Sequence, residues 1–384
     1  MVAEVRDGAS QRAVALRFGV SLATVQLWLT RAAGRPLDQV DWTDRPPIAG
    51  HVHRTRVELE DLVLDIRRIL REESVLGEYG PAAIRRELEA RSDLPGPLPA
   101  VRTIARILER RGALDAKRRV RRPAPPPGWY LPDVRRRTVE LDSFDVIDGL
   151  RLKGGLNLDI LTGISLHGGL VGVWPTAGVS AGITVAALDE HWRAVGLPGY
   201  AQFDNDTRFI GGHAHPNSIG PVIRFCLALG IVPVFAPPRE TGFQAAIEAF
   251  NGRWQRKLWA RFWDPTLADL QARSAAYVAA SRQRFTLRIE AAPGRAIFPV
   301  ERSIDLAAPP SGRLVFIRRT TDEGRASILG VRYPVDPHWL HRLVRSELDL
   351  DARHLRFFAL RRREPDDQPL LGEVPFEPPA RWFR

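Results

Sequence analysis

The sequence contains one cysteine and one methionine in 384 residues, and it has no apolar run long enough to span a membrane. The single cysteine, Cys226, excludes a disulfide within the chain and any zinc module that needs two cysteine ligands. Its setting, VIRFCLAL, is typical of a buried helix. No signal peptide is recognisable, so we expect a soluble, cytoplasmic protein with no membrane partner.

Acidic residues are fewer than basic ones, 45 Asp and Glu against 56 Lys and Arg, which gives a formal net charge of +11. Arginine supplies most of the basic side chains. Such an excess favours a polyanionic partner, because each phosphate that is neutralised releases counterions. With 44% hydrophobic residues, the chain is long enough for two or more domains with their own cores.

Three carboxylates stand at the ends of predicted strands or on a predicted helix, where their oxygens could bind metal ions. Asp142 ends the strand-like stretch TVELD, and Asp204 follows the apolar strand YAQF. Glu248 lies in a helix that begins near Gln244, on the shoulder of an apolar stripe. Carboxylates from three separate elements are the ligands with which two Mg²⁺ or Mn²⁺ ions clamp the attacking and leaving oxygens of a phosphoryl transfer.

The ordered set ELD (140–142), FDND (203–206) and AAIEAFNGRWQ (245–255) resembles the motifs of the Asp-Asp-Glu transposases and retroviral-type integrases. The resemblance implies a ribonuclease H-like catalytic core with two metal ions, and it assigns catalysis and metal binding to Asp142, Asp204 and Glu248. No other cofactor is implied. Asp206 stands where the family usually has Gly, so Asp206 could assist or replace Asp204.

Two further acids and a histidine pair compete for a role in this site. Asp145 and Asp148 follow Asp142 closely, but the pattern places both in the turn after the strand, and Asp142 is preferred. His213 and His215 lie in a Gly-rich loop without an evident third ligand, which favours a flexible loop over a metal site.

The element pattern over 138–300 predicts an α/β core with a mixed sheet. Three strands come first, and helices and strands then alternate, with helices from 244 to about 285. In the ribonuclease H-like fold the first and fourth strands are neighbours, which would bring Asp142 and Asp204 together.

Helical DNA-binding units are predicted ahead of this core. Residues 1–40 contain two helices that Ser10 and Ser21 can cap, with a turn at Gly19, and they resemble a helix-turn-helix. A plain helical hairpin is the alternative. Residues 54–116 resemble a second, winged-type helix-turn-helix, and 117–137 form a basic, Pro-rich linker. The candidate DNA contacts in these units are Thr24, Gln26, Arg31, Arg102 and Arg106.

Three more basic residues, Arg253, Arg256 and Lys257, follow Glu248 on the exposed side of its predicted helix and are also candidates for DNA contact. Beyond the core, short alternating strands over 301–365 predict a small, SH3-like β-barrel. The Pro-rich tail, 366–384, is expected to be extended or disordered. The predicted fold class is therefore a multidomain α/β protein.

These features predict a transposase or integrase of a mobile element that cleaves DNA 3′ ends and transfers the strands. Double-stranded DNA, both element ends and target, would be the partner, and the resemblance implies a homo-multimer and a bacterial, nucleoid-associated location. Two alternatives remain open: an inactive, domesticated DNA-binding regulator, and a simple metal-dependent nuclease of the same fold.

Overall fold

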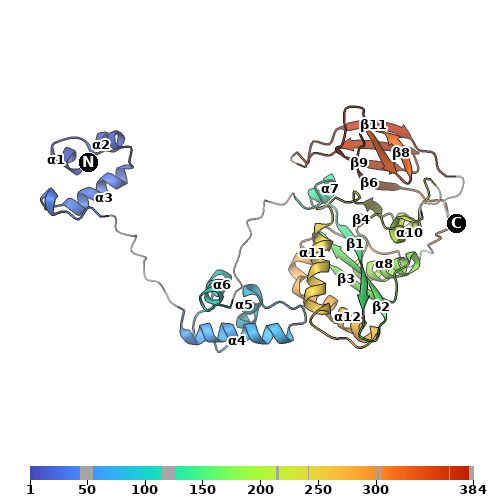
Figure 1. Cartoon of the computed structure of the whole chain (residues 1–384), viewed down its shortest axis with the longest axis horizontal. Coiled ribbons are helices and arrows are strands. Elements are labelled where there is room, and N and C mark those ends of the chain that lie inside the picture. The colour runs from blue at the N-terminus through green and yellow to red at the C-terminus, as the bar shows by residue number, and fades with distance from the viewer. Residues whose placement is uncertain are drawn as a thin grey trace. The chain divides into compact units, whose positions relative to one another are not determined.

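The computed structural model describes residues 1–43, 55–113, 126–212, 216–240, 242–299, 301, 304–362 and 364–379 (Figure 1). The chain divides into two compact units, Met1–Val57 and Glu58–Arg384. His213 and His215 lie outside the described residues, as does the first part of the predicted linker.

The first unit is helical, with α1 (Val2–Arg6), α2 (Gln11–Phe18), α3 (Leu22–Ala32) and the short 3₁₀ helix η1 (Leu37–Gln39). Both predicted caps are confirmed, because the hydroxyl of Ser10 accepts from the backbone N–H of Ala13 and that of Ser21 accepts from Thr24. Gly19 supplies the left-handed turn at φ 63°. Helices α2 and α3 are bent by 114° to each other.

In the parts of the chain that the structure describes, no single helix is long and apolar enough to cross a membrane. Only the bent pair α2 and α3, taken together, reaches that length and composition.

The second unit opens with three helices, α4 (Val57–Glu73), α5 (Pro81–Glu89) and α6 (Val101–Arg110). Their apolar faces meet in one small core that contains Val63, Ile84 and Ile104. Within residues 55–113 no strand accompanies these helices, so the described part of the predicted second DNA-binding unit has no wing.

The rest of the unit is built around a nine-stranded mixed sheet, in the order β11-β10-β9-β6-β5-β4-β1-β2-β3. The antiparallel strands β1 (Leu141–Arg151), β2 (Asn157–Ser165) and β3 (Val171–Thr176) come first. Strands β4 (Tyr200–Phe203) and β5 (Val232–Phe235) then run parallel to β1. The predicted mixed sheet and the predicted pairing of the first and fourth strands are thus confirmed.

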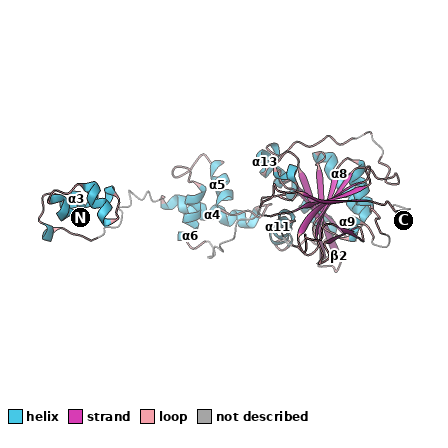
Figure 2. Ribbon diagram, turned by 90° about the horizontal axis from the view of Figure 1, so that it is seen from above, coloured by secondary structure: helices cyan, strands magenta, loops and turns pink. Residues whose placement is uncertain are grey.

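Helices flank this sheet, as Figure 2 shows. One core contains residues of α8 (Ala181–Val195), α9 (Thr207–Ile210) and α10 (Pro221–Ala228), packed with Phe144 of β1. A second core contains residues of α11 (Ala245–Trp254) and α12 (Leu267–Arg284), packed with Ile147 of the same strand. The π-helix η2 (Gln255–Trp259) continues α11, and α13 (Thr286–Glu290) follows α12. One face of β1 therefore packs against α8, α9 and α10, and the other face packs against α11 and α12.

The predicted separate β-barrel over 301–365 is corrected by the strand pairing. Strand β6 (Arg313–Arg319) pairs parallel with β5, and β9 (Leu343–Asp349) and β10 (His354–Ala359) continue the same sheet. Only β7 (Arg325–Ile328) and β8 (Val331–Pro334) form a separate hairpin. The physical reason is that β6 is apolar on both faces, a pattern that suits the interior of a sheet covered on both sides.

Segments at both ends of the sheet unit pack against the sheet. Strand β11 (Leu370–Pro375) pairs with β10 at the sheet edge, so this part of the predicted tail is ordered. In the last part of the predicted linker, Trp129 and Tyr130 are buried against the core beside α7 (Pro132–Arg135). These two aromatic residues anchor the chain to the sheet.

Candidate functional site

Two aspartates lie level with each other on neighbouring parallel strands. The register of β1 and β4 pairs Leu141 with Tyr200 and Ser143 with Gln202. Continued by two residues, it sets Asp145 beside Asp204, which follows the end of β4. Strand β1 runs on to Arg151, so Asp145 is inside the strand and not in a turn after it. Asp145 is therefore the residue of β1 level with Asp204, and the charge of Asp204 acts on it.

Asp142, the predicted first ligand, has a different environment. Its side chain is 1% exposed, and Arg295 binds both carboxylate oxygens, at 2.9 and 2.6 Å. The indole N–H of Trp192 donates to the same group at 3.0 Å. Burial acts to raise the pKa of Asp142, but the charge and hydrogen bonds of Arg295 hold it below its ordinary value. The structure thus pairs Asp142 with an arginine in the core, which corrects the prediction that it faces Asp204 and Glu248.

Asp145 is held by three neighbouring residues. The N–H of Val146 donates to one carboxylate oxygen at 2.9 Å, and the amide of Asn251 donates to the other at 2.8 Å. The hydroxyl of Thr162 in turn donates to Asn251 at 2.8 Å. Asn251 and Glu248 lie three positions apart on α11, a spacing that brings residues to the same side of a helix.

Negative charge accumulates around Asp145. Burial raises the pKa of this carboxyl to about 6, and the charges of Asp204, Glu248 and Asp148 act in the same direction, against the hydrogen bond from Val146. Burial likewise raises the pKa of Asp204. The two strand carboxylates and the helix glutamate therefore share one region in which negative charge is disfavoured unless a cation is added.

The turn after β4 separates the two aspartates of FDND. Asp204 accepts a hydrogen bond from the N–H of Asp206 at 2.9 Å. Asp206 caps α9, where it accepts from the N–H of Arg208 at 2.8 Å and pairs with its guanidinium at 2.6 Å. Arg208 thereby lowers the pKa of Asp206. Asp206 therefore has an arginine partner of its own within the turn.

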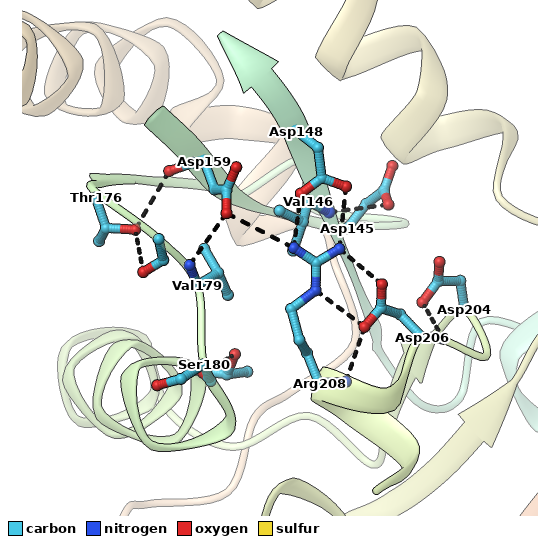
Figure 3. A network of polar contacts seen from close by, with 12 residues as sticks. Asp145, Val146, Asp148, Asp159, Thr176, Val179, Ser180, Asp204, Asp206 and Arg208 are labelled. Carbon is cyan, nitrogen blue, oxygen red and sulfur yellow. Dashed lines mark hydrogen bonds and ion pairs between the residues drawn. The ribbon is translucent and has the colours of Figure 1, made fainter. Parts of the chain in front are cut away.

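Arg208, which sequence reasoning did not single out, organises the acids beside the candidate site (Figure 3). Its guanidinium contacts both carboxylate oxygens of Asp148, at 2.6 and 3.0 Å, and lies 3.9 Å from Asp159. Asp148, the other competitor for a ligand role, is therefore neutralised by an arginine.

Glu248 lies in the first turn of α11 with an exposed side chain. The apolar stripe predicted beside it is confirmed, since Ile247, Phe250 and Trp254 are all buried. Among the residues that the structure describes, no group of three or more His, Cys, Asp or Glu side chains is close enough to hold a metal ion as it stands.

The three residues of the first unit that are predicted to contact DNA differ in their exposure and in their contacts within the protein. Gln26 is exposed on α3, whereas the hydroxyl of Thr24 bonds to Ser21 at 2.8 Å. Arg31 stacks on the ring of Trp28 at 4.6 Å. Gln26 is thus the most accessible of the three predicted residues.

In the second unit, the exposed candidates are Arg102 and Arg106 on α6 and Arg256 on η2. Arg253 is half-buried. The ammonium of Lys257 lies 3.9 Å from the ring centre of Tyr79, so this residue joins the helical part of the unit to η2. Arg110 and Arg111, further along α6, pair with Glu60.

No family model matches this sequence, and no curated protein matches it. Among solved structures, the chain is similar to a simian T-cell lymphotropic virus intasome in complex with the PP2A regulatory subunit B56 gamma, with 13% identity, 70% of this chain and 84% of that chain covered, and a TM-score of 0.35. It is also similar to the BIV integrase catalytic core domain, with 15% identity, 39% and 94% covered, and a TM-score of 0.30.

A further similar structure is the HTLV-2 integrase catalytic core domain in complex with magnesium, in its trimeric form. The identity is 15%, 35% of this chain and 80% of that chain are covered, and the TM-score is 0.27.

Proposed function

We propose that this protein is a transposase or integrase of a mobile element, which cleaves DNA 3′ ends and transfers the strands by metal-dependent phosphoryl transfer. The observation that carries the proposal is the placement of Asp145 level with Asp204 on adjacent parallel strands, where Glu248 of α11 acts electrostatically on Asp145. Asp145 takes the role that the sequence pattern assigned to Asp142.

The donor set fits hard divalent cations. Asp145, Asp204 and Glu248 offer only carboxylate oxygens, the ligand type that Mg²⁺ and Mn²⁺ prefer. Burial and the neighbouring carboxylates raise the pKa of Asp145, and among the described residues no arginine forms an ion pair with it, in contrast to Asp148 and Asp206. When bound, two such ions would activate the attacking oxygen and stabilise the leaving oxygen at phosphorus.

The surrounding residues orient the carboxylates. Asn251 and the N–H of Val146 each occupy one oxygen of Asp145, which leaves the remaining lone pairs of both oxygens for a metal. The N–H of Asp206 does the same for Asp204. Arg208 holds Asp148 and Asp206 in ion pairs, so that these acids do not compete as ligands.

The proposed partner is double-stranded DNA, both element ends and target, bound by a homo-multimer. A net charge of +11 supports binding to a polyanion, and Gln26, Arg102, Arg106 and Arg256 are exposed to reach it. We expect the helical first unit to read base edges and the arginines to contact phosphates.

The test is a cleavage and joining assay on labelled duplexes that carry the DNA sequences flanking the gene, with Mg²⁺ or Mn²⁺. Asp145→Asn, Asp204→Asn and Glu248→Gln should each abolish cleavage and joining. Asp148→Asn is the matched control, because this exposed carboxylate pairs with Arg208, and it should keep most of the activity.

The same assay distinguishes the proposed function from a simple nuclease and from a DNA-binding regulator. Products that are cut but never joined would support a simple nuclease. Wild-type protein that binds the duplexes without cutting them under either metal would support a DNA-binding regulator and contradict the proposal.

A further inference from the structure

Arg318 of β6 is a buried arginine without a carboxylate partner. The residue is 7% exposed, and no Asp or Glu among the described residues lies within ion-pair distance of it. Burial lowers the pKa of Arg318 to about 10, so the side chain is still charged at neutral pH. A buried charge is costly unless its hydrogen bonds are made.

Oxygen atoms from four residues accept the hydrogen bonds of this guanidinium. Three of them are backbone carbonyls, those of Ser327 at 3.0 Å, Ala236 at 3.2 Å and Ile317 at 2.8 Å. The fourth is the side-chain oxygen of Asn205, at 2.7 Å. Only arginine offers donors in a planar fork that can reach acceptors on several sides at once.

Two of these acceptors belong to the segments that carry the candidate acids. Asn205 lies between Asp204 and Asp206, in the turn after β4. Ala236 directly follows β5 and begins the segment that leads to α11 and Glu248. The amide of Asn205 donates to the carbonyl of Ala236 at 2.7 Å. Arg318, Asn205 and Ala236 therefore close a ring of hydrogen bonds.

We infer that Arg318 is a positioning residue for the acid site. It joins the turn that carries Asp204 to the start of the segment that leads to Glu248, and it does so from a strand that lies beyond the predicted catalytic core. This inference rests on the proposed function for its effect on metal binding, whereas the joining of the two segments is testable without it.

A second buried arginine, on the neighbouring strand β9, serves as a control. Arg345 is also 7% exposed, and burial also lowers its pKa to about 10. Its contacts are different, because it forms an ion pair with Glu347, packs over the ring of Phe358 at 4.3 Å and donates to Gln368 at 3.0 Å. Since Arg345→Met also leaves Glu347 without its partner, a general effect of losing a buried arginine should be at least as large at this position as at Arg318.

The experiment compares Arg318→Met, Arg318→Lys and Arg345→Met in the full chain. The first readout is amide hydrogen exchange in residues 204–210 and 236–247, without metal. The second is the dissociation constant for Mn²⁺, measured by titration calorimetry, with Asp204→Asn as the variant that should lose binding.

We expect both Arg318 variants to speed exchange in the two segments and to weaken Mn²⁺ binding about tenfold, the lower end of the effect of losing an outer-shell contact. Arg345→Met should change neither readout. Combining Arg318→Met with Asn205→Ala should weaken binding by less than the sum of the two separate effects, because the two residues share one hydrogen bond.

One result would contradict the inference about Arg318, and a different result would contradict the proposed metal site. If exchange in 204–210 and 236–247 is the same in Arg318→Met as in Arg345→Met, Arg318 does not position these segments. If wild-type Mn²⁺ binding is absent or is unaffected by Asp204→Asn, the proposed metal site fails, while the exchange data still decide the role of Arg318.

Discussion

At the scale of single residues, two aspartates of β1 show how position decides between a structural and a chemical role. Asp142 faces Arg295 and Trp192 in one layer of the core, whereas Asp145 faces Asn251 in the other. Residues separated by an odd number of positions in a strand point to opposite faces of the sheet. The same side-chain type therefore stabilises the fold at one position, whereas at the other its charge is disfavoured by burial and by neighbouring carboxylates.

Substitutions at these two aspartates should have opposite effects on stability. Asp142→Asn leaves the buried charge of Arg295 without its carboxylate and should lower the free energy of unfolding by roughly 3–5 kcal/mol. Asp145→Asn removes a carboxylate whose folded pKa, about 6, lies above its ordinary value, so stability at pH 7.5 should stay the same or rise. Urea denaturation without metal measures both. A stable Asp142→Asn variant would contradict this assignment.

His191 should make the fold sensitive to acid. Burial lowers its pKa to about 4, opposed by the charge of Asp142 and assisted by those of Arg295 and Arg282. The unfolded chain takes up a proton on this residue below about pH 6.5, but the folded chain does not, so stability falls as the pH falls from 6.5 towards 4.

Between pH 7 and 5 the loss from His191 should be about 2 kcal/mol, at 1.36 kcal/mol per pH unit below 6.5. His191→Gln should remove this part of the acid loss. Denaturation curves at both pH values provide the measurement, and equal losses in wild type and variant would show that His191 does not titrate as described.

At the scale of elements, β6 decides the architecture of the C-terminal half. Its side chains alternate between two cores, with Leu314 and Phe316 in one and Val315 and Ile317 in the other. The ring of Phe316 stacks on that of Phe235 in the adjoining strand at 5.2 Å between centroids. A strand buried on both faces and paired on both edges cannot be removed without exposing both layers.

Separate expression of residues 126–300 and 301–384 should therefore give two poorly folded fragments. The first would expose β5 as an apolar edge, a form that favours aggregation, and the second would lose the partner of β6. Circular dichroism and size-exclusion chromatography of each fragment, with 126–384 as the folded control, provide the test. A monomeric, cooperatively unfolding 301–384 would support the separate barrel instead.

At the scale of the whole molecule, the division at residue 57 separates a helical unit with its own small cores from the unit that holds the acids. The excess positive charge belongs to the chain as a whole, at +11. Long-range attraction for a polyanion depends on that total, whereas the chemistry depends on a few carboxylates.

A chain that begins at residue 56 should keep the stability of the second unit but bind DNA more weakly. We expect its thermal midpoint to match that of the sheet transition in the full chain. Each phosphate contact that is lost should reduce the slope of log K against log salt concentration by about 0.9. Fluorescence anisotropy over a series of NaCl concentrations measures this slope.

The matched control for the deletion is the full chain with Arg102→Gln and Arg106→Gln, which removes two exposed charges and leaves the first unit intact. An unchanged affinity and slope after the deletion would show that the first unit does not take part in DNA binding.

Much of this molecule follows from local sequence. Ser10 and Ser21 cap helices because a hydroxyl at that position satisfies a free backbone N–H, and no distant residue is needed. The stripe of Ile247, Phe250 and Trp254 predicts α11 because its period is that of a helix. The position of Asp204 at the end of β4 was predictable from the apolar run YAQF, whereas the pairing of the first and fourth strands was expected from the family resemblance.

Other features depend on partners distant in sequence. Pairing with β2 decides whether β1 ends at Asp142 or continues past Asp145. The ion pair that holds Asp142 in the core comes from Arg295, 153 positions away in the sequence. Strand β6 is inserted beside β5, and Arg318 meets Asn205, through contacts that span more than 75 residues. Local propensity determined which residues form helices and strands, and tertiary packing decided which face each acid occupies, because a strand presents both faces until its neighbours cover them.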